Sequence, residues 1–126
     1  MTDLSNLAGL IENLSGARVL TIGDVMLDRY VTGEVERISP EAPIPVLRVS
    51  GENAMLGGAG NVIANIAALG GSARFVALTG DDGAGDEVAR LLGRLATVSA
   101  DLVVADGRHT TLKTRFVGAG QQLVRA

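Results

Sequence analysis

Two aspartates follow the first apolar run of the sequence. Asp24 and Asp28 lie within GDVMLDRY, residues 23–30. Ionised carboxylates only accept hydrogen bonds, so they suit a ligand that offers several hydroxyl donors, such as a sugar. The structural alternative is that Asp24 caps a turn while Asp28 faces solvent.

A glycine-rich turn ending in asparagine comes later, at LGGAGN, residues 56–61. Gly57 and Gly58 let the backbone approach a ligand closely, and Asn61 would lie near a helix N-terminus, where free amides favour oxygen-rich groups. The alternative is a tight loop with close helix packing. The spacing fits neither a dinucleotide fingerprint nor a P-loop, because Ile63 stands where the third glycine would be and the only lysine is not preceded by the required glycines.

Alternating apolar segments predict the elements that position these residues. Helical spacing predicts a first helix, capped by Thr2 or Asp3 and stopped at Gly16. Later segments alternate between strands and helices: strands at 17–23, 73–80 and 100–106, and helices at 61–69 and 85–95. This alternation predicts βαβ units, with helices on both faces of a mainly parallel sheet and the first strand buried on both sides. Ligands bind at the carboxyl ends of such strands.

Residues 30–56 interrupt the alternation. They contain all three prolines and little helical periodicity, which predicts an extended β excursion outside the main sheet. The apolar face of such a flap needs a partner, either another subunit or a bound ligand. Two further strands are expected around the glycine turn GAG, at 110–117 and 121–126. The open edge of the last strand suggests a fragment of a longer protein.

Composition excludes several functional classes. The chain has 126 residues, a net charge of -3 and no cysteine. A nucleic-acid partner would need a clustered basic excess, and a membrane span would need about 18 consecutive apolar residues, so we expect neither. The absence of cysteine is compatible with a cytoplasmic location.

Three stretches together resemble the ribokinase-like (PfkB) carbohydrate kinases. They are VLTIGDVMLDRYVTGEVERISPEAPIPVLRV, GGAGNVIANIAALGGSARFVALTGDD and TTLKTRFVGAGQQLVRA. RISPEAPIPV and QQLVR are most similar to the heptose 7-phosphate kinase domains of bifunctional heptose kinase/adenylyltransferases.

The resemblance implies an α/β, ribokinase-like fold with a mainly parallel sheet, flanking helices and a small β lid at about 30–56. Residues 1–126 would be the N-terminal sugar-binding part, without the C-terminal ATP-binding half. The implied enzyme phosphorylates heptose 7-phosphate at the C1 hydroxyl with ATP and Mg²⁺, for ADP-heptose and lipopolysaccharide synthesis. It would be cytoplasmic and dimerise through the lid.

The resemblance also implies a set of substrate-binding residues. Lys113 and Arg115 are candidates for the 7-phosphate, and their alternative is an edge-strand charge facing water. The sugar would be bound by Asp24, Asp28, Gly57, Gly58 and Asn61.

No catalytic residue or metal ligand is expected in these residues. GAGD at 83–86 spells the family's catalytic signature, but it stands at an ordinary strand-to-helix connection, so Asp86 is expected to be a first-turn acid. His109 has no visible partner and receives no role. The isolated chain is therefore expected to be inactive. The alternatives are another sugar or nucleoside kinase of the family, or a non-catalytic sugar-phosphate-binding or dimerisation module.

Overall fold

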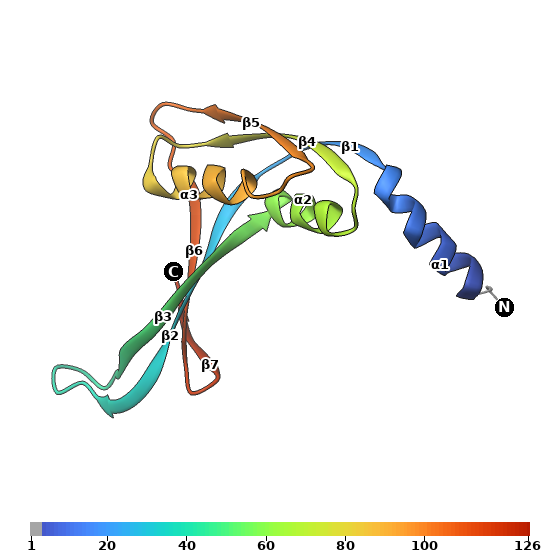
Figure 1. Ribbon diagram of the computed structural model, residues 1–126. Helices are drawn as coiled ribbons and strands as arrows, with labels where there is room; N and C mark the ends of the chain where they lie inside the picture. The colour runs from blue at the N-terminus through green and yellow to red at the C-terminus, as the bar shows by residue number, and fades with distance from the viewer. Residues whose placement is uncertain (1–3) are drawn as a thin grey trace.

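The N-terminal helix is present as the leucine spacing predicts. The structure, a computed structural model, describes residues 4–126, so the predicted cap at Thr2 or Asp3 lies outside it. Helix α1 (Leu4–Glu12) continues into a 3-10 turn, η1 (Asn13–Gly16). Figure 1 shows α1 extending away from the rest of the chain. No helix within the described residues is long and apolar enough to cross a membrane.

A three-stranded parallel sheet forms the body of the molecule, in the order β1-β4-β5. Helices α2 and α3 lie on the same side of this sheet (Figure 1). Phe75, Ile63, Val88 and Leu92 are buried between the sheet and the helices. The elements of the body are β1 (Arg18–Ile22), α2 (Ala59–Ala68), β4 (Ser72–Thr79), α3 (Gly83–Leu92) and β5 (Val98–Val104).

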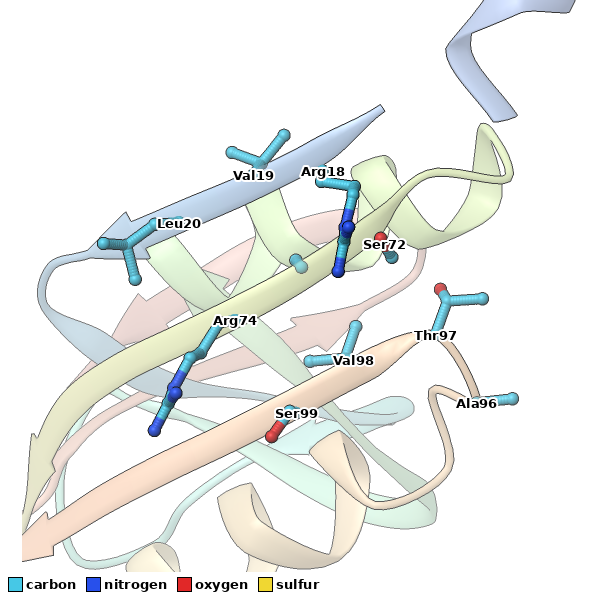
Figure 2. Close-up of a pocket in the computed structure, with 10 residues that line it drawn as sticks. Arg18, Val19, Leu20, Ser72, Arg74, Ala96, Thr97, Val98 and Ser99 are labelled. Carbon is cyan, nitrogen blue, oxygen red and sulfur yellow. The ribbon is translucent and has the colours of Figure 1, made fainter. Parts of the chain in front are cut away.

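The opposite face of the body sheet is open. The prediction that the first strand is buried on both sides is wrong for this chain, because Leu20 and Ile22 are 62% and 73% exposed. The expectation of helices on both faces fails for the same reason, since α2 and α3 both pack on the other face. Figure 2 shows Leu20 and Arg74 beside a shallow hollow on the open face. Arg74 Nε donates to Asp101 Oδ2 across 2.7 Å.

A second, four-stranded sheet projects from the body (Figure 1). We call it the lid sheet. Its order is β3-β2-β6-β7, with β2 antiparallel to β3 and parallel to β6. Its strands are β2 (Val25–Ile38), β3 (Pro45–Gly58), β6 (Thr111–Gly118) and β7 (Gln121–Arg125).

The lid hairpin is longer than the sequence predicts. Residues 30–56 form β structure as expected, but the ladder begins at the pair Val25 and Gly58. Only Gly23 and Asp24 separate β1 from β2, so the chain turns directly from the body into the lid. Asp28, expected just beyond the carboxyl end of the first strand, consequently lies inside the second strand.

Candidate functional site

Asp28 is the centre of a charged cluster on one face of the lid sheet. It is in register with Met55 of β3 and Lys113 of β6, so the three side chains share a face. Lys113 Nζ lies 2.9 Å from Asp28 Oδ1, and Arg115 Nη1 lies 3.5 Å from the same oxygen. The three charged side chains are only 15% to 24% exposed. The structure thus brings together three of the residues predicted to bind a sugar phosphate.

The alternative reading of Lys113 as an edge-strand charge facing water is wrong. Strand β6 lies between β2 and β7, so Lys113 is on an interior strand. Arg115 stacks over the Tyr30 ring, with the guanidinium carbon 5.1 Å from the ring centroid. Sequence reasoning missed Tyr30 as a member of this cluster. The signal was the strand period of two, which places Asp28 with Tyr30 and Lys113 with Arg115 on single faces.

The cluster holds polar atoms that lack hydrogen-bond partners. Among the described residues, Asp28 Oδ1 and Arg115 Nη1 are buried and have no partner in hydrogen-bond geometry, although both lie within ion-pair distance. A buried polar group without a partner is costly, commonly by about 1–3 kcal/mol. The carboxylate and the guanidinium are therefore paired by charge without good hydrogen-bond geometry, and a ligand that offers both hydroxyl and anionic groups would satisfy the cluster better.

The two glycines at the end of β3 differ in how they lie relative to this cluster. A Cβ on Gly57 would lie 2.8 Å from both Asp28 Oδ2 and Met26 Cγ. Gly58 has a φ of 59°, and its Cβ would lie 2.6 Å from the Asp24 carbonyl oxygen. The tight-loop explanation is therefore sufficient for Gly58. Gly57 does more, because its missing side chain leaves room for the Asp28 carboxylate.

Asp24 and Asn61 lie next to the cluster in the chain but are not part of it. Asp24 is exposed and borders a hollow of about 180 Å³ with Ile22 and Leu78, while its carbonyl accepts from the Ala59 N–H at 2.9 Å. Asn61 is exposed in the first turn of α2, which begins two residues earlier than predicted. Within residues 4–126, no side-chain hydrogen bond joins either residue to Asp28. Their roles stay predictions.

A larger hollow, of about 540 Å³, lies on the open face of the body sheet (Figure 2). It has little chemistry to offer a sugar phosphate. Of its two arginines, Arg74 is already paired with Asp101, and the hydrogen bond from Arg74, followed by the charge of Asp101, raises the pKa of the guanidinium. The lid-sheet cluster is therefore the better candidate site.

The GAGD tetrapeptide occupies the position that the sequence predicts. Asp86 is an acid in the first turn of α3, and the helix is capped by Asp82. His109 is exposed and lies 3.8 Å from Asp82. Among the described residues, no three His, Cys, Asp or Glu side chains gather to hold a metal ion.

Three features together define a ribokinase-like α/β protein. They are the parallel body sheet, the lid sheet that rises directly from its first strand, and the charged cluster on that lid. Residues 17–126 match the pfkB family carbohydrate kinase model, and the chain belongs to this family.

Among its relatives, the chain is 56% identical to the Bifunctional protein HldE of Paramagnetospirillum magneticum over 126 residues, which is 100% of the chain and 26% of that protein. It is 55% identical to the Bifunctional protein HldE of Rhodospirillum rubrum, covering 95% of the chain and 24% of the relative. The chain thus spans about a quarter of the length of these relatives.

A similar solved structure is a carbohydrate kinase from Agrobacterium tumefaciens, with a TM-score of 0.69 and 26% identity. The match covers 87% of this chain and 34% of that one. A ribokinase from Cryptococcus neoformans, at 24% identity and a TM-score of 0.61, supports the fold alone. The ribokinase-like fold expected from the sequence is confirmed.

Proposed function

We propose that this chain is the sugar-binding part of an ATP-dependent kinase that phosphorylates heptose 7-phosphate at its C1 hydroxyl, a step toward ADP-heptose and lipopolysaccharide. Membership of the pfkB family and similarity to HldE proteins along the whole chain support the reaction class and the sugar. The enzyme would work in the cytoplasm.

The observation that carries the proposal is the group of three charges around one buried oxygen. Asp28 would accept hydrogen bonds from sugar hydroxyls, while Lys113 and Arg115 would donate to the 7-phosphate. Because the two cations outnumber the single carboxylate, the cluster carries a net charge of about +1, which favours an anionic ligand. Gly57 and Gly58 would line the same site, with Asp24 and Asn61 at its border.

ATP and Mg²⁺ would be held outside these residues. Phosphoryl transfer depends on positioning and on stabilising the developing charge, and within residues 4–126 no three His, Cys, Asp or Glu side chains gather to hold a metal ion. We therefore propose that the chain alone binds the sugar phosphate without consuming ATP. A chimera in which it replaces the matching region of the Paramagnetospirillum magneticum relative should turn over.

Replacing Lys113 with methionine tests the phosphate assignment. The variant keeps the length of the side chain but removes its charge, so the affinity for heptose 7-phosphate should fall about tenfold or more. Affinity for unphosphorylated heptose should stay within about twofold, because its hydroxyls are assigned to Asp28. Isothermal titration calorimetry with both sugars measures the difference.

Arg108→Met is the matched control, because Arg108 is an exposed cation that precedes the same strand. If both variants weaken heptose 7-phosphate binding equally, the effect of Lys113→Met comes from the loss of net positive charge and not from a contact with the phosphate. Binding of neither sugar by the unaltered chain would overturn the proposed function. Binding without turnover in the chimera would favour the non-catalytic module instead.

We also propose that two lids pair to form a homodimer. An apolar groove of about 420 Å³ lies on the lid sheet, and exposed apolar residues on a sheet need a covering partner. It is lined by Ile44, Pro45, Leu47, Phe116, Leu123 and Val124.

Ile44→Glu should shift the chain from dimer to monomer in sedimentation velocity, with the dissociation constant rising about tenfold or more because a charge would be buried. Ile38→Glu is the control, since Ile38 is as exposed as Ile44 but lies outside the groove. An unaltered chain that is monomeric at high concentration would contradict the lid dimer.

A further inference from the structure

Asp82 joins two parts of the chain that are distant in sequence. Its Oδ1 accepts the Gly85 N–H at 2.8 Å and so caps α3. Its Oδ2 accepts the Thr110 N–H at 2.8 Å, a residue 28 positions later and immediately before β6. A single carboxylate therefore connects the start of a body helix to the start of a lid strand.

Thr110 is held at a second point. Its hydroxyl oxygen accepts the buried Gly80 N–H at 2.8 Å, and the residue is only 5% exposed. The packing around it is close. A Cβ on Gly80 would lie 3.0 Å from both Asp82 Oδ2 and the Thr110 nitrogen, and one on Gly85 would lie 2.6 Å from the Gly80 carbonyl oxygen. The start of β6 is thus fixed to the end of β4.

The position of this start decides where the cations of β6 lie. Lys113 is three residues after Thr110, about 10 Å along a strand. In the observed register Lys113 is opposite Asp28 and Arg115 is opposite Tyr30. A slip of one residue would turn both cations to the other face of the lid sheet.

We propose that Asp82 is a positioning residue for sugar-phosphate binding: by fixing the start of β6, it holds Lys113 and Arg115 beside Asp28. This inference rests on the function proposed above and assigns Asp82 no contact with the sugar. Its influence is transmitted through β6 alone.

The Asp82 carboxylate is well suited to this bridge. The hydrogen bond from the Thr110 backbone, followed by those from the Gly85 backbone and the Thr110 side chain, lowers the pKa of Asp82. An ionised carboxylate offers two acceptor oxygens to two amides that face it from different elements. A side chain with a single oxygen cannot place that oxygen 2.8 Å from both amides as the two carboxylate oxygens do.

Asp82→Ser separates the bridge from the helix cap. Serine caps a helix about as well as aspartate does, but it has one oxygen and cannot also hold Thr110. We expect the affinity of the chain for heptose 7-phosphate to fall about tenfold, the size expected for loosening a charge-assisted contact, while affinity for unphosphorylated heptose changes less than about twofold. Asp81→Ser, the same change at the exposed neighbouring residue, should alter neither.

The path through β6 is tested in a background that already lacks both cations, Lys113→Met with Arg115→Met. There, Asp82→Ser should weaken heptose 7-phosphate binding by less than about twofold further, because the residues it positions are gone. Thermal melting identifies any unfolded variant. If Asp82→Ser is unfolded, Asp82→Asn carries the same comparison, since asparagine also caps and supplies one acceptor oxygen.

The outcomes distinguish the inference from the function on which it rests. Three results would overturn the positioning role. They are that Asp82→Ser weakens the binding of both sugars equally, that it weakens heptose 7-phosphate binding as much without the two cations as with them, or that it has no effect on binding. If removing Lys113 and Arg115 leaves heptose 7-phosphate binding unchanged, the assignment of the phosphate site fails, and with it the inference.

Discussion

Asp28→Asn should reduce kcat/KM for heptose 7-phosphate about a hundredfold in the kinase chimera, the loss expected when charge-assisted hydrogen bonds worth about 1.5–3 kcal/mol each disappear. The amide would keep one acceptor oxygen, which would turn toward Lys113 and Arg115 because these lie 2.9 and 3.5 Å from Oδ1 of the present carboxylate, and its NH₂ group would replace the oxygen offered to the sugar. Two partly buried cations would lose their counter-charge, and the hydroxyls of the sugar would lose their acceptor.

The two sugars separate the effects of this substitution. Unphosphorylated heptose depends on Asp28 as an acceptor, so its affinity for the chain should fall with the turnover of the chimera. Heptose 7-phosphate should lose less affinity than turnover, because removing a negative charge near Lys113 and Arg115 favours the phosphate. Steady-state kinetics of the chimera and calorimetry of the chain provide both numbers. Asp81→Asn, at an exposed aspartate, is the control.

Unchanged turnover in Asp28→Asn would remove Asp28 from the site and would leave the cluster as a structural ion pair of the lid sheet. If Asp28→Asn instead bound both sugars more tightly, Asp28 would also be removed from the site, because its carboxylate would then oppose ligand binding.

The main elements of the body could be predicted because their signals are local. The apolar run before Gly80 and the helical spacing around Ile63 reflect burial against immediate neighbours, and the structure confirms both elements. The open face could not be predicted from the same signal. Leu20 and Ile22 have the composition of a doubly buried strand, yet α2 and α3 both lie on the other side.

The candidate site was harder to predict than the elements that carry it. Asp28 and Lys113 were each selected separately, but their pairing depends on the parallel alignment of β2 with β6, which is a long-range contact without a local signature. The position of Asp28 inside β2 depends on how soon the chain turns after β1, and boundaries of this kind are the least certain part of any sequence reading. The bridging role of Asp82 could not be predicted from the sequence, because helix caps are common and its second partner, Thr110, is remote in sequence.

Gly57→Ala should weaken binding of both heptose and heptose 7-phosphate about tenfold or more, because the new methyl group would lie 2.8 Å from Asp28 Oδ2 and from Met26 Cγ. The carboxylate would have to leave its position beside Lys113. Unlike Lys113→Met, this substitution should affect the two sugars alike, since it displaces the group proposed to bind hydroxyls. The measurement is calorimetric titration of the chain with each sugar.

Gly51→Ala is the matched control on the same strand and the same face. Its Cβ would meet only Thr32 Oγ1, at 3.4 Å, so the methyl group fits and binding should not change. Melting curves should show that Gly57→Ala also destabilises the lid sheet, by about 1–3 kcal/mol, because the added methyl group overpacks it. If Gly57→Ala remains folded and binds both sugars as tightly as Gly51→Ala does, the space beside Asp28 is not part of the binding site, and the ligand must approach the cluster from the side of β6.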